Sequence, residues 1–268
     1  MPLANASLVT GLPPKLSRYA AVAGILMKYG RNVPDPEAAE ESDLPDKLAH
    51  DLEALGPTFI KLGQVLSTRS DLLPPAYLEA LARLQDDIEP FPFADVQRIV
   101  EEELGARLSK AFSVFEEKPI AAASLGQVHR AALRDGRAVA VKVQRPGVAE
   151  TIEKDLEALD EIAGFLGSRT ETGRRYDLVG MVNEFRTAIT LELDYTKEAE
   201  NLRIIGANLE EFELIVVPQP VEGYTAKRVL TMDYVGGTKV TEVSPVVKLD
   251  LERDVLADML VRAYLSAH

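Results

Sequence analysis

Apolar residues recur at helical spacing through the first hundred residues of the chain. Prolines and glycines interrupt the pattern and so predict five helices, over residues 16–29, 44–55, 58–71, 76–84 and 94–104. In the third of these, Phe59, Leu62 and Leu66 fall on one side and are expected to be buried. Thr58 is expected to be its N-cap. Gly63 costs about 1 kcal/mol relative to alanine inside a helix, which indicates a close packing neighbour.

The periodicity changes from helical to alternating near residue 109. Asp135-Gly136 is a strong hairpin signal, and the strand that follows it, residues 138–144, alternates with period two. Val139, Val141 and Val143 form one face of this strand. The other face carries small and polar residues: Ala138, Ala140, Lys142 and Gln144.

A lysine among alanines leaves room for a flat ligand whose charged end meets the ammonium group. Together with the run of small residues at 121–127, this hairpin suits a site for nucleotide phosphates. The alternative is an edge hairpin whose lysine only prevents aggregation between sheets.

The second half of the chain returns to helical spacing and then to strands. Helices are predicted around the apolar stripes at 152–166 and 178–189. Strands are predicted over 213–217 and 228–235, and a last helix over 250–267.

Three carboxylates follow the second of these helical stripes. Glu192 occupies a position where the periodicity calls for an apolar residue, and burying an unpaired carboxylate is costly. Asp194 and Glu198 are four residues apart, so on a helix they would share a face. The group then needs a cation, which could be Lys142, Lys61 or a metal ion. Alternatively, Glu192 only marks the end of a helix in solvent.

Composition narrows the possible functions. The 268 residues are 46% hydrophobic, which is ample for a core, and the net charge of −13 argues against a nucleic-acid partner. The absence of cysteine excludes thiolate chemistry and cysteine-bound metals, and the three histidines are too widely spaced to predict a metal site. No apolar run is long enough for a membrane span. We therefore expect a cytoplasmic protein, with contact between residues 16–28 and a membrane surface as an open alternative.

Three strings of residues resemble the UbiB/AarF family of atypical kinases, to which the ADCK proteins belong. They are Lys61-Leu62-Gly63-Gln64, the run from Ala121 to Gln127, and Glu192-Leu193-Asp194 followed by Glu198. The resemblance extends from about residue 16 to the end. It implies an α+β fold in which a protein-kinase-like N-lobe, a small antiparallel sheet with an αC-like helix, follows an all-helical extension. The expected ranges are 1–108 for the extension, 109–237 for the N-lobe and hinge, and 238–268 for the start of a truncated C-lobe.

The resemblance also implies roles for individual residues. Lys142 would hold the phosphates of ATP, with Glu198 as its ion-pair partner. Lys61 would lie close to Glu192 and Asp194, on a helix that covers the active site. The remaining nucleotide-binding residues would come from an alanine-rich loop, the strands and the hinge: Ala121, Ala122, Ala123, Ser124, Gln127, Ala140, Asp233 and Val235.

A kinase or ATPase using ATP and Mg²⁺ is the activity that the resemblance implies, directed at a small molecule or lipid and linked to isoprenoid quinone (ubiquinone) biosynthesis. The expected partners are the nucleotide and lipids or proteins of the quinone pathway. The family's catalytic loop and Asp-Phe-Gly-like motif, which would hold Mg²⁺, do not occur before His268. This chain alone is therefore expected to be inactive, and the alternative function is that of a nucleotide-binding or regulatory fragment.

Overall fold

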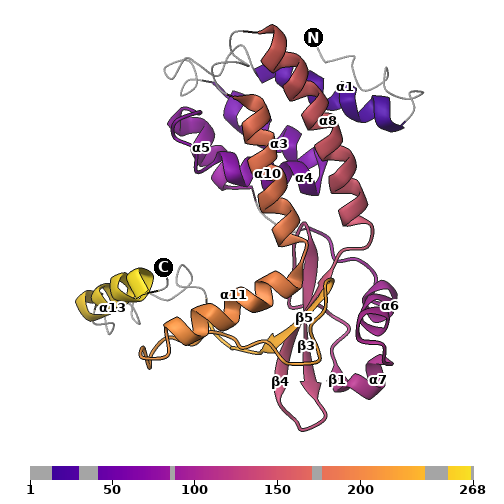
Figure 1. The fold of residues 1–268 in the computed structure, drawn as a ribbon, viewed down its shortest axis with the longest axis vertical. Coiled ribbons are helices and arrows are strands. Elements are labelled where there is room, and N and C mark those ends of the chain that lie inside the picture. The colour runs from indigo at the N-terminus through magenta and orange to yellow at the C-terminus, as the bar shows by residue number, and fades with distance from the viewer. Residues whose placement is uncertain (1–13, 30–41, 85–87, 171–176, 239–252, 267–268) are drawn as a thin grey trace. The chain divides into compact units, whose positions relative to one another are not determined.

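The computed structural model describes residues 14–29, 42–84, 88–170, 177–238 and 253–266. The chain forms two compact units, each assembled from several stretches of sequence (Figure 1). The first unit comprises residues 1–89, 122–125 and 145–190, and its described part is helical. The second comprises residues 90–121, 126–144 and 191–268 and carries most of the sheet.

The helices of the first unit form in the regions where the apolar stripes predict them. They are α1 (Pro14–Tyr29), α3 (Leu44–Leu55), α4 (Pro57–Leu66), α5 (Pro75–Ala82), α8 (Val148–Arg169) and most of α10 (Leu178–Glu192). The helix expected over residues 58–71 is shorter than predicted and begins one residue earlier. Gly56 is its N-cap, so the assignment of Thr58 as the cap is wrong. Among the described helices of the chain, none is both long and apolar enough to cross a bilayer.

Helix α4 buries a different side from the one that its apolar spacing predicts. Phe59 is buried as expected, but Leu62 and Leu66 are only partly buried, because Thr58, Ile60 and Gly63 complete the inner side. A Cβ atom on Gly63 would meet a methyl group of Leu84 and would approach the leucines at 52 and 81 to within 3.2 and 3.4 Å. The expected close packing at this glycine is therefore confirmed.

A single buried carboxylate ties the helices of the first unit together. Asp155 of α8 is 1% exposed, and the Arg18 guanidinium donates to both of its oxygens, with Nη2 2.6 Å from Oδ2. The Thr58 hydroxyl donates to the same carboxylate, and Arg18 also donates to the Leu55 carbonyl at 2.7 Å. Because a buried charge must be paired, this cluster fixes α1 and α4 against α8.

The second unit contains an antiparallel sheet with strand order β1-β3-β4-β5. Its strands are β1 (Phe112–Phe115), β3 (Gly126–Leu133), β4 (Ala138–Gln144) and β5 (Val229–Asp233), and the short β2 (Ala121–Ala122) pairs with β3. The predicted turn at Asp135-Gly136 joins β3 to β4, and Gly136 has the positive φ of 90° that favours glycine. The α+β class, with a small antiparallel sheet, is thus confirmed.

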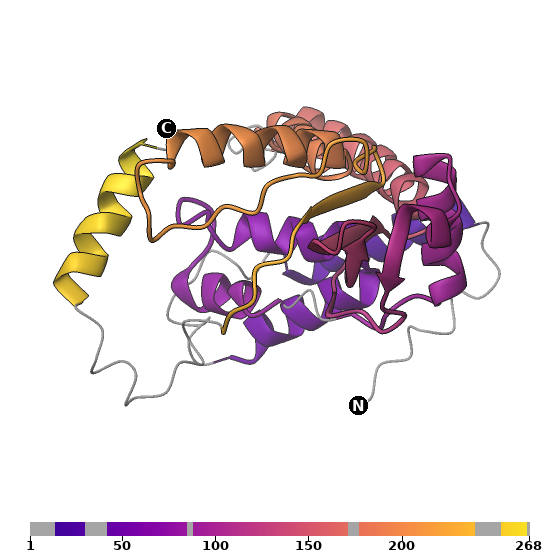
Figure 2. The same ribbon diagram turned by 90° about the horizontal axis from the view of Figure 1, so that it is seen from below.

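Two helices cover opposite faces of this sheet. Helix α6 (Phe93–Leu104) packs its apolar side on the predicted valine face of β4, in one core that contains Val96, Ile99, Val100, Val139, Val141 and Val143. On the other face, α11 (Tyr195–Asn208) runs alongside β5 (Figure 2). It packs against Leu230 of β5, the residue paired with Lys142. The short α7 (Leu108–Ala111) leads into β1, and α13 (Arg253–Ser266) follows β5. The lysine face of β4 therefore lies on the same side of the sheet as α11.

The strand predicted over residues 213–217 is absent. Leu214 and Val216 are 78% and 67% exposed, and the segment is irregular. Further along the chain, the Val221 amide donates to the Thr231 carbonyl of β5 at 2.8 Å, and the Gln219 carbonyl accepts from the Asp233 amide at 3.0 Å. The prolines at 218 and 220 have no amide hydrogen, so this pairing does not extend into a regular strand.

A buried histidine joins three segments of the second unit. His129 on β3 is fully buried, and its Nδ1 lies 2.8 Å from the Glu116 carbonyl, to which it must donate. Its Nε2 lies 2.9 Å from the amide nitrogen of Gln127, so Nε2 accepts and the ring is neutral. Gln127 in turn accepts from the Phe91 amide at 2.9 Å. Burial lowers the pKa of His129 below its ordinary value.

This buried imidazole predicts a loss of stability in mild acid. The unfolded chain protonates His129 near its ordinary pKa of 6.5, whereas the folded protein does so only at lower pH. The free energy of unfolding should therefore fall as the pH drops below about 6.5, by up to about 1.4 kcal/mol per unit of pKa difference. Urea denaturation at pH 7.5 and 5.5 measures this decrease.

The matched variants are His129→Asn, which keeps a side-chain N–H near the Glu116 carbonyl, and His50→Asn on the exposed surface of α3. The His129 variant should lose much less stability between the two pH values than the wild type, and the His50 variant should behave as the wild type does. An equal pH response in all three proteins would contradict the assignment.

Candidate functional site

The lysine of β4 and the third of the predicted carboxylates form an ion pair. Lys142 Nζ lies 2.7 Å from Glu198 Oε2. The two residues are 56 positions apart in the sequence, with Lys142 on β4 and Glu198 in the first turn of α11. They are 30% and 37% exposed, so a ligand in solvent can reach the ammonium group without unfolding either element.

A tyrosine that the sequence analysis did not single out supports this pair. Tyr195 is the first residue of α11, and its ring centroid lies 4.6 Å from Lys142 Nζ. Such a cation–π contact contributes about 0.5–2 kcal/mol. Tyr195 is 1% exposed, and burial, with Glu198 and Glu192 nearby, raises its pKa, so the phenol stays neutral. Its spacing of three residues from Glu198 on a predicted helix is the signal that would have identified it.

Gly126 allows the tyrosine to reach its position beneath the lysine. A Cβ atom at residue 126 would lie 2.5 Å from the carbonyl oxygen of Val143 and 2.6 Å from the Tyr195 hydroxyl. Both distances are shorter than side chains tolerate, and one of the atoms belongs to the backbone of β4. The close approach of β3, β4 and Tyr195 therefore requires glycine at this position of the small-residue run.

The other two carboxylates, Asp194 and Glu192, lie at the start of α11 and at the end of α10. Asp194 is the N-cap of α11, where it accepts from the Thr196 amide at 3.0 Å and from the Thr196 hydroxyl. These hydrogen bonds lower its pKa. Its backbone is extended, so the expectation that Asp194 and Glu198 share a helical face is wrong. Glu192 is exposed at the last position of α10.

No metal centre accounts for the carboxylates within the described ranges, which hold no group of three or more acidic or histidine side chains able to bind an ion. Of the cations considered from the sequence, Lys142 lies against a carboxylate, that of Glu198. Lys61 lies on α4 in the first unit, and Glu192 and Asp194 lie in the second. Their expected proximity stays a prediction.

Arg145 fixes the alanine-rich segment, residues 121–124, by hydrogen bonds to backbone carbonyls. The Arg145 amide donates to the Leu125 carbonyl at 2.8 Å, and its guanidinium donates to the carbonyls of Ala123 at 3.4 Å and Glu89 at 3.0 Å. The accessibility of the segment decreases along the chain, from exposed Ala121 through partly buried Ala122 and Ala123 to buried Ser124. The backbone of this segment is therefore fixed by a residue that follows β4.

Two further residues that were predicted to contact the nucleotide, Gln127 and Ala140, are buried. Gln127 is 1% exposed, and its amide is bonded to the Phe91 backbone and to His129. Ala140 is 7% exposed and pairs with Met232.

At the end of β5, the Asp233 carboxylate accepts from Arg137 at 2.8 Å and from the Gln219 amide at 3.1 Å. Val235, two residues later, is 48% exposed. The side chain of Asp233 is thus engaged within the sheet, and its part in ligand binding stays a prediction.

A small antiparallel sheet, with a strand lysine paired to a glutamate on the covering helix, is the arrangement of protein-kinase-like proteins. Residues 83–268 match the ABC1 atypical kinase-like domain. The chain belongs to this family.

Relatives extend the similarity to most of the chain. The protein ACTIVITY OF BC1 COMPLEX KINASE 8, chloroplastic, of Arabidopsis thaliana is 43% identical over 221 residues, which cover 82% of this chain and 29% of the relative. A "Probable protein kinase UbiB" of Marinobacter nauticus is 39% identical over 221 residues, or 82% of this chain and 40% of the relative. The chain therefore spans less than half the length of these curated relatives.

A solved structure shares the fold. It is the complex of Rv3197 with erythromycin from Mycobacterium tuberculosis, to which this chain is 34% identical with a TM-score of 0.52. The similarity covers 68% of this chain and 45% of that one.

The contact at Gly126 predicts a specific loss of stability. Gly126→Ala should destabilise the protein by about 2 kcal/mol, because the added methyl group meets a strand backbone and a fully buried tyrosine. Urea denaturation measures the difference. The control is Gly164→Ala in the exposed middle of α8, where nothing lies within 4 Å of the added atom, and the change should stabilise by up to about 1 kcal/mol. Equal effects of the two changes would refute the close approach at residue 126.

Proposed function

We propose that the second unit binds ATP, with Lys142 holding the nucleotide phosphates and Glu198 fixing the position of the lysine. The observation that carries this is the 2.7 Å ion pair between a strand lysine and a helix glutamate, within reach of solvent. Protein kinases place a lysine and a glutamate in these two roles. Membership of the ABC1 atypical kinase-like family supports the assignment.

The physical properties of the pair suit a phosphate ligand. An ammonium group is a compact point charge with three donors, so it can keep its bond to Glu198 and still donate to phosphate oxygens. The Tyr195 ring beneath the ammonium restricts its position further. Ala140 lies on the same face of β4 as Lys142, and we assign to its small side chain the contact with the flat base.

We assign the surrounding segments by the same reasoning. The alanine-rich segment 121–124, fixed by Arg145, would cover the phosphates, and the backbone of residues 233–235 would meet the adenine. Lys61 and Gln64 on α4 would close the site near Glu192 and Asp194. In this proposal residues 109–237 are the kinase-like N-lobe and hinge, and 238–268 begin a C-lobe.

Mg²⁺ does not fit the described carboxylates. Asp194 caps α11, Glu198 is paired with Lys142, and the residues described here form no group that could hold a metal ion. We therefore assign the Mg²⁺ ligands to the C-lobe part of the whole protein, and no catalytic step to this chain alone.

The activity of the whole protein is proposed as phosphoryl transfer or ATP hydrolysis of the UbiB type, directed at a small molecule or lipid of isoprenoid quinone biosynthesis. The similarity to a protein solved with erythromycin supports a small-molecule ligand in this family. Peripheral contact with a membrane through α1 is compatible with the exposed side chains of Leu26 and Met27. A second candidate is a regulatory module that binds nucleotide without turnover, which the engagement of Glu198 by Lys142 and of Asp194 by Thr196 favours.

The proposed function predicts the effect of removing the lysine. Lys142→Ala should weaken ATP binding by the 268-residue chain at least about tenfold, equivalent to about 1.4 kcal/mol, because the phosphates lose their cationic contact. Isothermal titration with ATP, with and without Mg²⁺, measures the affinity. Lys118→Ala removes an exposed lysine from the same unit and should leave the affinity within about twofold of the wild type.

Equal affinities for ATP in the wild type and in Lys142→Ala would contradict the proposal. Measurement of ATP turnover by the whole protein separates the two candidates. Hydrolysis that depends on Lys142 would reject the regulatory module, and binding without hydrolysis would favour it.

A further inference from the structure

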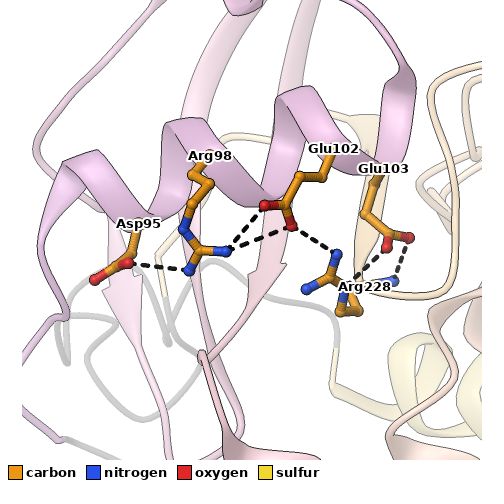
Figure 3. Close-up of polar contacts among 5 residues, drawn as sticks. All are labelled: Asp95, Arg98, Glu102, Glu103 and Arg228. Carbon is orange, nitrogen blue, oxygen red and sulfur yellow. Dashed lines mark hydrogen bonds and ion pairs between the residues drawn. The ribbon is translucent and has the colours of Figure 1, made fainter.

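A line of charged residues runs along α6 and ends on the loop before β5. Figure 3 shows Arg98 between Asp95 and Glu102, with Glu102 and Glu103 both reaching Arg228. The contacts of Arg98 are on the exposed surface, where such pairs contribute little. Glu103 differs from the other acids in the line because its side chain is only 15% exposed.

Glu103 accepts hydrogen bonds from both the side chain and the backbone amide of Arg228. One carboxylate oxygen accepts from the Arg228 Nε at 2.7 Å, and the other accepts from the Arg228 backbone amide at 3.1 Å. The hydrogen bond to Glu103 is the main cause of the raised pKa of Arg228. A single side chain therefore fixes the loop residue at two points, and the contact is shielded from water more than the one made by Glu102.

Arg228 belongs to a tight turn that holds two other elements. Ala226 and Val229 exchange hydrogen bonds of 2.8 and 3.3 Å, which leaves Lys227 and Arg228 at the tip. The Lys227 carbonyl accepts from the Tyr195 amide, and the Arg228 carbonyl accepts from the Gln144 amide, both at 3.0 Å.

The turn thus joins the first residue of α11 to the end of β4. Gln144 strengthens the connection, since its side-chain amide donates to the Leu193 carbonyl at 2.8 Å. Helix α11 buries only Tyr195 and Ala199 of its own residues, so the position of its first turn depends strongly on these hydrogen bonds. Glu198 lies in that first turn, and a shift of the turn at 226–229 would change its distance from Lys142.

We propose that Glu103 is a positioning residue for the Lys142–Glu198 pair: through Arg228 it fixes the turn that sets the start of α11. The proposal rests on the nucleotide-binding function proposed above. Glu103 itself lies on α6, on the opposite face of the sheet from the ligand. Helix α6 does not need this contact to stay on the sheet, because Val96, Ile99 and Val100 are almost completely buried. Loss of the contact should therefore affect α11 more than the fold.

The test compares two neighbouring acids on α6. Glu103→Gln keeps the size of the side chain but removes its charge, and should weaken ATP binding by the 268-residue chain about tenfold, a typical coupling between sites. Glu102→Gln removes an exposed charge that also meets Arg228 and should change the affinity less than about twofold. Thermal melting of both variants checks that each is folded under the titration conditions.

A double-variant comparison distinguishes positioning from a general loss of structure. In a Glu198→Ala background there is no carboxylate to position, so Glu103→Gln should cause little further loss of affinity. A purely structural role would weaken binding by the same factor in both backgrounds, which would overturn the proposal. If Glu103→Gln does not fold, Arg228→Lys serves in its place, because lysine keeps the charge but cannot make the contact at Nε.

The outcomes also separate this inference from the function on which it rests. If Lys142→Ala leaves ATP affinity unchanged, the nucleotide function itself fails. If Lys142→Ala weakens binding but Glu103→Gln matches Glu102→Gln, the function stands and the positioning role is rejected.

Discussion

The ion pair between Lys142 and Glu198 is the interaction on which the candidate site of the second unit depends. A lysine on a central strand needs a counter-charge and access to water, and the sheet supplies both on the face opposite the valine core. Several local features serve this one contact. Asp194 begins α11 at the right residue, Tyr195 lies beneath the ammonium, and Gly126 leaves room for the tyrosine.

Apolar periodicity and polar contacts have different tasks in this chain. The apolar stripes decide which elements form and which sides they bury, as in the valine face beneath α6. Single shielded polar groups then fix elements that are far apart in sequence. Asp155 does so among the helices of the first unit, and the His129–Gln127 pair and Glu103 do so in the second. A polar group shielded from water needs a hydrogen-bond partner, so each of these contacts specifies one arrangement.

The parts of the fold that were predictable depend on local pattern, and the others depend on contacts that no local pattern records. The hairpin at Asp135-Gly136 follows from turn chemistry, and the lysine strand from its alternation. The expected strand at 213–217 is absent because regular pairing with β5 is interrupted by prolines further along. Asp194 was placed inside a helix that it in fact caps. The contact between Glu103 and Arg228 spans 125 residues, so only the folded chain reveals it.

The central claim is that Lys142 and Glu198 act as one unit on a nucleotide. A double-mutant cycle of Lys142→Ala and Glu198→Ala, measured as ATP affinity by titration calorimetry, tests it most directly. The account predicts that each change weakens binding and that the double variant binds about as weakly as Lys142→Ala alone, because Glu198 acts only through the lysine. Losses that add in the double variant, or unchanged affinity in either single variant, would contradict it.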